Sequence, residues 1–229
     1  MINNNRILGV IPARKGSKGL PGKNLKNLGD KPLIAWSIIE AKKSKYIDRC
    51  IVSTDDEEIA QLAKKYGCEV PFMRPAELAT DDANVNDVFL HVLDLLREQY
   101  DILVVLQPTS PLRESEDIDH ALEMIEHENV SAVVSVCKSN KPLPWHFTIE
   151  KDGVLKSVFP RKKLSVNRQE LSPTYLPNGA LFIAYTDFFR SKTTFYTESK
   201  STFAYIMPPE RSVDIDNRID FFTAEAIIG

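Results

Sequence analysis

A loop rich in glycine and basic residues is the part of this 229-residue sequence that most clearly suggests chemistry. Three glycines follow one another at a step of three, with cations between and beside them. The glycines are Gly16, Gly19 and Gly22, and the cations are Arg14, Lys15, Lys18 and Lys23. Glycines let backbone N–H groups approach an anion closely, and fixed cations neutralise a polyphosphate. The loop therefore predicts a polyphosphate site.

Two familiar phosphate-binding motifs do not fit this loop. A Walker A motif needs a glycine where this sequence has Ser17, and Ser or Thr where it has Asn24. The dinucleotide fingerprint needs a Gly-x-Gly pair, whereas the glycine step here is three throughout. Neither a P-loop ATPase nor a dehydrogenase is supported.

A pair of aspartates near the end of the sequence suggests a metal site. Asp214 and Asp216 alternate with Val213 and Ile215, which is the period of a β-strand. On a strand, both carboxylates would face one side, roughly 6.6–7 Å apart. Mg²⁺ takes one or two carboxylates together with waters and phosphate oxygens. We therefore predict that Asp214 and Asp216 bind Mg²⁺ beside the polyphosphate.

Short apolar runs alternate with segments of helical period through the first 137 residues. The predicted strands are Ile7–Ile11, Cys50–Ser53, Ile102–Leu106 and Ala132–Val136. Helices are predicted from Pro32, over 56–66, over 85–96 and over 118–125. Runs this rich in Ile and Val suit strands buried on both faces of a parallel sheet. The alternation predicts a three-layer α/β/α sandwich with right-handed crossovers.

Residues 138–177 interrupt this pattern with five prolines and only short strand-like pieces, His146–Ile149 and Val154–Phe159. The α/β pattern then resumes with Ala180–Tyr185, Phe203–Met207 and a helix from about Arg218. We interpret 138–177 as a mainly β excursion within one domain, residues 1–229. A projecting hairpin cannot bury its apolar face alone, so Trp145, Phe147 and Tyr175 are expected at a subunit interface.

Composition narrows the class of protein. There are 29 Lys and Arg against 32 Asp and Glu, with a net charge of −3 and a pI near 5.9. This balance argues against binding to nucleic acid or to an anionic membrane. No apolar run approaches the roughly 18 residues of a membrane span. Three cysteines without a CxxC motif, and no signal-like segment, predict a cytoplasmic protein.

The ordered set of motifs resembles the acylneuraminate cytidylyltransferases, the CMP–sialic acid synthetases. The string Pro-Ala-Arg-Lys-Gly-Ser-Lys-Gly-Leu-Pro-Gly-Lys-Asn over residues 12–24 resembles the family's loop most closely. The resemblance continues at residues 53–55, 74–78, 107–113, 168–169, 177–179 and 213–216. It implies a Rossmann-like nucleotidyltransferase fold, a dimerisation excursion giving a homodimer, and transfer of CMP from CTP to an acidic nine-carbon sugar.

The resemblance also implies roles for single residues. Those that would bind the nucleotide are Arg14, Ser17, Lys23, Asn24, Arg74 and Ala83, and those that would bind the sugar are Gln107, Arg168 and Gln169. Arg14, Lys23 and Arg168 would be catalytic. Relatives often carry serines where this sequence has Ala83, so its contact would have to come from the backbone.

Three rival functions stay open from the sequence. Leu176 stands where some sialic acid enzymes carry arginine, which keeps a CMP-legionaminate or CMP-pseudaminate synthetase in play. The Arg-x-Gly-Ser-Lys-Gly string of the loop argues against an enzyme that acts on Kdo-type acids. A non-catalytic nucleotide-binding module is the alternative from another class, and the intact aspartate pair argues against it.

Overall fold

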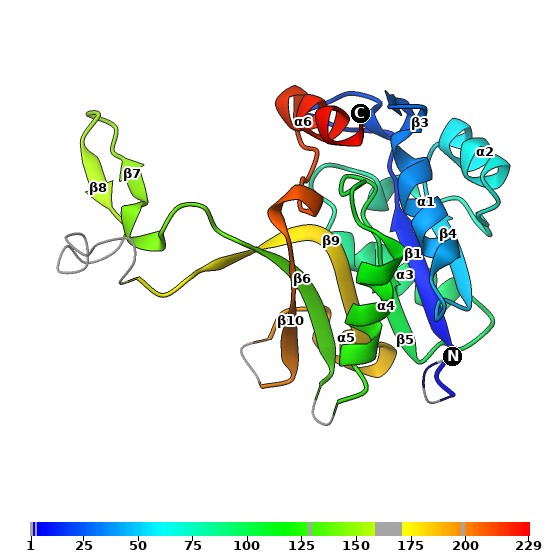
Figure 1. Cartoon of the computed structure of the whole chain (residues 1–229). Helices are drawn as coiled ribbons and strands as arrows, with labels where there is room; N and C mark the ends of the chain where they lie inside the picture. The colour runs from blue at the N-terminus through cyan, green and yellow to red at the C-terminus, as the bar shows by residue number, and fades with distance from the viewer. Residues whose placement is uncertain (1, 3, 128–129, 159–170, 198–199) are drawn as a thin grey trace.

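A six-stranded mixed sheet forms the centre of the molecule (Figure 1). The computed structural model describes residues 2, 4–127, 130–158, 171–197 and 200–229. The strands, in their order across the sheet, are β10 (Thr202–Met207), β6 (Ala132–Lys138), β9 (Tyr175–Tyr185), β5 (Ile102–Val105), β1 (Ile7–Pro12) and β4 (Arg49–Ser53). All four residues of β5 and the first five of β1 are buried, as expected for strands covered on both faces.

The four strands predicted within the first 137 residues run parallel to one another, but β9 does not. β9 lies between β5 and β6 and is antiparallel to both. The parallel arrangement expected for those four strands is therefore confirmed, but the whole sheet is mixed because β9 runs in the opposite direction. The chain leaves β6 at its carboxyl end for the excursion, so the strand that brings it back enters the sheet from that same end.

Helices cover both faces of the sheet, which confirms the three-layer α/β/α prediction. The helices are α1 (Leu33–Lys43), α2 (Glu57–Lys65), α3 (Val85–Leu95), α4 (Ser115–Met124), α5 (Thr186–Lys192) and α6 (Arg218–Ile228). One core cluster joins the sheet to α1, α2 and α4. A second core cluster joins it to α3 and α5. None of the described helices is long and apolar enough to cross a membrane.

Local sequence signals explain where α2 begins and ends. The Asp56 carboxylate accepts hydrogen bonds from the backbone N–H groups of Glu58 and Ile59 at 2.7 and 3.3 Å. Such a cap satisfies donors that the first turn of a helix leaves free. Gly67 follows the helix with φ +76°, a conformation that favours glycine.

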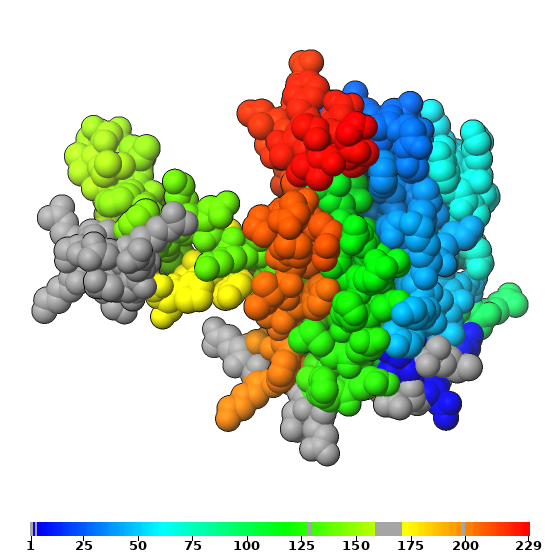
Figure 2. Space-filling view, in the orientation of Figure 1, coloured from blue at the N-terminus to red at the C-terminus, as the bar shows by residue number. Residues whose placement is uncertain are grey.

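The described part of residues 138–177 leaves the sheet and extends away from it (Figures 1 and 2). Lys138 still pairs with Tyr175, so the two ends of the segment belong to β6 and β9. Beyond them, β7 (Phe147–Ile149) and β8 (Leu155–Ser157) form an antiparallel hairpin. The predicted strand over Val154–Phe159 is thus shorter than expected, and Phe159 lies outside the described residues.

Candidate active site

A cavity of about 430 Å³ lies at the carboxyl ends of β1 and β5. Ligands of open α/β sheets gather at this edge. The predicted site residues that line it are Arg14, Ser17, Lys23, Asn24, Arg74, Gln107 and Asp216. Seven side chains chosen from four separate stretches of sequence therefore surround one space.

The glycine loop (residues 14–24) and the acidic segment (residues 212–216) are in direct contact. Lys23 Nζ donates to the carbonyl oxygen of Ile215 at 2.7 Å and lies 3.5 Å from Asp216 Oδ1. Gly19 lies so close to Asp216 that a methyl group at Gly19 would be 2.0 Å from the Asp216 carbonyl oxygen. Glycine is therefore required at position 19 by the packing of one segment on the other.

The acidic segment is not the strand that its sequence pattern predicts. Residues 212–215 belong to no helix or strand. The Ile215 N–H group donates instead to the carbonyl oxygen of Thr109, at 2.8 Å, in the loop after β5. Alternation placed Ile215 in the core correctly, because Ile215 is fully buried. Alternation reports which side a residue faces, whereas sheet membership depends on a neighbouring strand that the sequence pattern does not reveal.

The two carboxylates have different surroundings. Asp214 Oδ1 is buried and accepts no hydrogen bond from any residue that the structure describes. Burial raises the pKa of the Asp214 carboxyl, and a hydrogen bond from the Thr109 side chain only partly offsets this. The Asp216 side chain is 79% exposed. An unsatisfied buried carboxylate oxygen beside a basic loop has the chemistry of a cation ligand.

Arg14 is held by the loop that precedes α3. Its Nη2 lies 2.7 Å from Asp81 Oδ1, and its Nη1 donates to the Ala79 carbonyl oxygen at 3.2 Å. Lys18 Nζ pairs with the second oxygen of Asp81 at 3.1 Å. Hydrogen bonds from these two cations hold the pKa of the Asp81 carboxyl below its usual value. Asp81 thus orients two of the loop's four cations, a role that no local pattern indicates.

Asn24 supports the loop from within. It is buried, and its Nδ2 donates to the Arg14 carbonyl oxygen at 3.1 Å. Asn24 therefore ties the two ends of the glycine loop together while also lining the cavity.

Arg74 reaches the cavity from the segment after α2. Its side chain is buried, with Nε donating to Ser53 Oγ at 3.2 Å and Nη2 to the Ser53 carbonyl oxygen at 2.5 Å. Burial lowers the pKa of the Arg74 guanidinium to about 10. A guanidinium fixed in this way on the end of β4 can present its remaining donors to a ligand. Ala83 is half-buried and is not among the residues that line this cavity, so its role stays a prediction.

A fully buried arginine lies behind Gln107. Arg113 Nη2 donates to Ser37 Oγ at 2.8 Å, and Ser37 Oγ donates to the Gln107 carbonyl oxygen at 3.2 Å. Arg113 Nη1 also donates to the Ala180 carbonyl oxygen at 2.8 Å. Burial lowers the pKa of Arg113 to about 10. Arg113 therefore fixes the backbone from which the Gln107 side chain projects.

Gln107 separates the main cavity from a smaller apolar one. This second pocket, of about 190 Å³, shares Val85 and Gln107 with the first. Its other lining residues include Phe89, Val105, Phe182, Phe195 and Tyr196. Gln107 Oε1 and Asp214 Oδ2 both approach Gly179, where φ is +74° and a methyl group would lie 2.9 and 3.0 Å from them. The apolar pocket thus adjoins the cavity that the glycine loop lines.

Two of the predicted site residues lie outside the part of the chain that the structure describes. Three residues that support the site were not predicted from the sequence. Arg168 and Gln169 lie outside the described residues. Sequence reasoning assigned no role to Asp81, Arg113 or Asn178. The last two belong to the motif strings at 107–113 and 177–179, which were a usable signal, whereas Asp81 lies in an ordinary acidic loop.

Comparison with known proteins gives relatives across the whole chain. A cytidylyltransferase family model matches residues 8–225. N-acylneuraminate cytidylyltransferase from Escherichia coli is 39% identical over 223 residues, which are 97% of this chain and 52% of that protein. CMP-N,N'-diacetyllegionaminic acid synthase from Legionella pneumophila is 37% identical over 97% of this chain and 96% of that protein. The chain therefore spans about half the length of the first relative and nearly all of the second.

Solved structures agree on the fold. CMP:2-keto-3-deoxy-manno-octonic acid synthetase, complexed with CTP, superposes with a TM-score of 0.72 at 17% identity, covering 97% of this chain and 98% of that one. A 4-diphosphocytidyl-2C-methyl-D-erythritol synthase from Anaerococcus prevotii gives 0.67 at 14% identity, covering 99% and 97%. With the family match over residues 8–225, the chain belongs to the cytidylyltransferase family.

Proposed function

We propose that this enzyme transfers CMP from CTP to the anomeric hydroxyl of an N-acylneuraminic acid, a sialic-type nonulosonic acid. The sugar oxygen forms a bond to the α-phosphorus, the bond to the β-phosphate breaks, and pyrophosphate leaves while the hydroxyl proton is released. The contact of the Lys23 loop with the segment of Asp214 and Asp216 carries this proposal, because it joins cations for a triphosphate to carboxylates for a metal. Phosphoryl transfer depends mainly on such positioning and electrostatic stabilisation.

The nucleotide would occupy the 430 Å³ cavity. Arg14 and Lys23 would neutralise the triphosphate, and Ser17 and the loop N–H groups would donate to its oxygens. Asn24 would act by holding the loop at the Arg14 carbonyl. Arg74, whose guanidinium is fixed by Ser53, would donate to the cytosine carbonyl.

The acidic pair would bind Mg²⁺. The unpartnered Asp214 Oδ1 and the exposed Asp216 carboxylate are two hard oxygen ligands, and they fit this ion. Among the described residues no three His, Cys, Asp or Glu side chains gather as a metal cluster. The remaining ligands would therefore be CTP oxygens and water, a ligand set that Mg²⁺ favours. Bound there, Mg²⁺ would neutralise charge on the phosphates.

The sugar would lie on the Gln107 side of the cavity. Gln107 offers an amide to sugar hydroxyls, and the neighbouring aromatic pocket could take an apolar substituent such as an acyl methyl group. Arg168 and Gln169 would bind the sugar carboxylate, for which a guanidinium is a planar bidentate partner. The relative from Legionella and the pseudaminic acid cytidylyltransferase of Campylobacter jejuni, 29% identical over 95% of this chain, favour legionaminic or pseudaminic acid as the second candidate acceptor.

We further propose a homodimer joined through the apolar face of the β7–β8 hairpin. The cytoplasmic location of the protein stays a prediction, made from its three cysteines without a CxxC motif. Cys50, Cys68 and Cys137 are all free thiols in the structure.

The experiment is a pyrophosphate-release assay with CTP, Mg²⁺ and a panel of N-acylneuraminic, legionaminic and pseudaminic acids. We expect turnover, and the ratio of kcat/KM values identifies the acceptor. CTP binding in calorimetry without turnover of any acidic sugar would leave a nucleotide-binding module and end the enzymatic proposal.

A further inference from the structure

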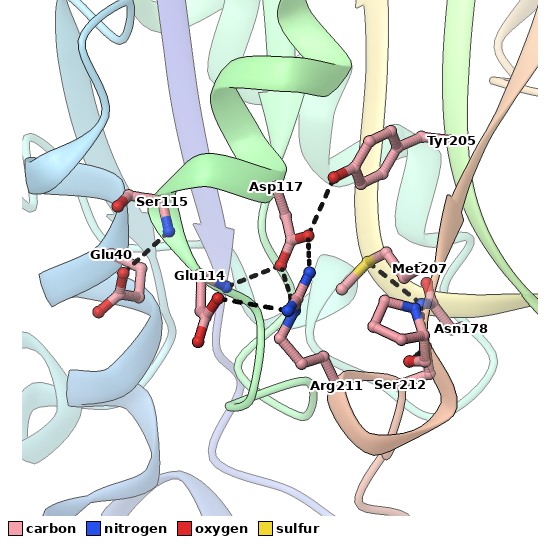
Figure 3. A network of polar contacts seen from close by, with 10 residues as sticks. Glu40, Glu114, Ser115, Asp117, Asn178, Tyr205, Met207, Arg211 and Ser212 are labelled. Atoms are coloured by element: carbon pink, nitrogen blue, oxygen red, sulfur yellow. Dashed lines mark hydrogen bonds and ion pairs between the residues drawn. The ribbon is translucent and has the colours of Figure 1, made fainter.

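An ion pair between Arg211 and Asp117 fixes the stretch of chain that leads into the acidic segment (Figure 3). Arg211 Nη2 and Nε donate to the two oxygens of Asp117 at 2.9 and 3.1 Å. Asp117 lies in the first turn of α4 and its side chain is only 1% exposed. Arg211 ends the short 3-10 helix Pro209–Arg211, three residues before Asp214. A two-point contact of this kind fixes orientation as well as distance.

The Asp117 carboxylate is fully engaged. Besides the two donors of Arg211, it accepts from Tyr205 Oη at 3.0 Å and from the Glu114 N–H group at 3.0 Å. Arg211 Nη1 also lies 3.5 Å from a carboxylate oxygen of Glu114. The anchor therefore belongs to the rigid body of the molecule, because β10 and the start of α4 both hold it.

A second anchor lies at the next residue. Asn178 Nδ2 donates to Ser212 Oγ at 2.9 Å, and Ser212 Oγ donates to the Pro208 carbonyl oxygen at 2.8 Å. Asn178 is itself buried, and its Oδ1 accepts from Ser135 Oγ at 2.6 Å in β6. Arg211 and Ser212 thus tie consecutive positions of the chain to α4 and to the sheet.

The acidic segment lacks the backbone hydrogen bonds that a neighbouring strand would supply, and these two anchors hold it in their place. Residues 212–215 belong to no strand. The Ile215 backbone is held by its N–H bond to the Thr109 carbonyl oxygen and by the Lys23 Nζ bond to its own carbonyl oxygen. Functional groups must be held to within about 0.5 Å of their working geometry. Neither Arg211 nor Asp117 lines the nucleotide cavity. Their influence on chemistry must therefore pass through the position of Asp214 and Asp216.

We infer that the Arg211–Asp117 ion pair is a positioning device for the two metal-binding carboxylates, setting the affinity for the divalent cation and not that for CTP. This rests on the proposed function of the Asp214–Asp216 pair. Residues that orient metal ligands in this way typically change metal affinity or activity by about 10–100-fold when they are removed.

The test compares wild type with Arg211→Lys, Arg211→Met and the double variant Asp117→Asn/Arg211→Met. The lysine variant keeps the charge without the planar fork. The double variant removes both charges, so that no carboxylate is left buried without its cation. Tyr205→Phe is the matched control, because it removes a donor to the same Asp117 oxygen without touching residues 208–212.

Three measurements separate positioning from a general loss of structure. Mn²⁺ affinity is measured by water-proton relaxation with the protein saturated by CTP and no acceptor sugar present. CTP affinity is measured by calorimetry without metal, and exchange of the Ile215 amide is followed by hydrogen–deuterium exchange. We expect Mn²⁺ affinity to fall about 10–100-fold in Arg211→Met and in the double variant, and less in Arg211→Lys. Metal-free CTP affinity should be unchanged, and Ile215 exchange should accelerate while β5 stays protected.

The inference is overturned if Mn²⁺ affinity is unchanged, if metal-free CTP affinity falls equally, or if Tyr205→Phe gives the same loss. Since no arm needs an acceptor sugar, failure of the proposed reaction is recognised separately. It would appear as absent turnover by wild type, while the binding and exchange measurements still decide the role of Arg211.

Discussion

Two carboxylates only two residues apart have opposite surroundings in this protein. Asp214 is held largely inside the molecule with one oxygen unpartnered among the described residues, whereas Asp216 projects into solvent near Lys23. A buried unsatisfied carboxylate destabilises a fold unless a ligand uses it. Binding of a cation would explain why Asp214 is buried with an unpartnered oxygen. The exposed Asp216 needs no such explanation.

Asp214→Asn should lower kcat by about 100-fold, the loss typical of removing one electrostatic group from a transition state. Its melting temperature should be equal to or above that of wild type, because a neutral amide is buried more favourably than a charged carboxylate. Asp216→Asn should also lower kcat strongly, with a free energy of unfolding within about 0.5 kcal/mol of wild type. Steady-state pyrophosphate release and thermal unfolding check both variants. Unchanged rates in both would remove the metal assignment.

Arg14→Ala should lower kcat/KM by an amount equivalent to about 3–4 kcal/mol, if its guanidinium stabilises the reacting phosphates. Lys18→Ala is the matched control, since Lys18 pairs with the same Asp81 but is mostly exposed. An exposed pair of this kind contributes about 0–1 kcal/mol. We expect Lys18→Ala to stay within a few-fold of wild type in the same assay. Equal losses in both variants would show that Arg14 acts only through general charge.

The packing of the glycine loop on the acidic segment distinguishes two glycines of one element. A methyl group at Gly19 would lie 2.0 Å from the Asp216 carbonyl oxygen, whereas at Gly16 it would meet no described atom within 4 Å. Gly19→Ala must therefore push the loop and the acidic segment apart. We expect kcat/KM for CTP to fall by about 100-fold, as when a small misplacement disturbs reacting groups.

Gly16→Ala, measured beside it, should lose much less activity than Gly19→Ala, because its added methyl group meets no described protein atom. Its unfolding free energy should be unchanged or up to about 1 kcal/mol higher, because alanine reduces the freedom of the unfolded chain. If Gly16→Ala lost as much activity as Gly19→Ala, flexibility of the loop and not its contact with Asp216 would be the requirement.

Elements defined by local chemistry were predictable from the sequence. Asp56 and Gly67 mark the ends of α2, and the Ile- and Val-rich run of β1 identifies a strand buried on both faces. The glycine loop was recognisable because its glycines and cations suit a polyphosphate, and that binding role stays a prediction. Contacts between distant residues were not predictable in this way. The direction of β9 and the pairing of Asp117 with Arg211 depend on partners 70–95 positions away, which no local pattern encodes.

The shape of the whole molecule poses a separate question, because the β7–β8 hairpin stands away from the body (Figure 2). Ile149 pairs directly with Leu155, and Phe147 lies two residues from Ile149, so the three share one face. Ile149 is 74% and Leu155 is 61% exposed. A two-stranded hairpin with an uncovered apolar face is marginal in water. A second copy of the chain would cover this face and stabilise the hairpin.

Sedimentation velocity at micromolar concentration should therefore give a dimer for wild type and a monomer for Ile149→Lys/Leu155→Lys, since two buried ammonium groups would oppose association. Ile219→Lys is the control, because Ile219 is 76% exposed on α6, in the body of the molecule. This variant should stay dimeric, which would separate the hairpin face from surface hydrophobicity in general. A monomeric wild type, or equal dissociation of the Ile219 variant, would contradict the hairpin interface.

Because Arg168 and Gln169 belong to the same excursion, loss of the dimer with unchanged kcat/KM for the sugar would further show that one protomer holds a complete site.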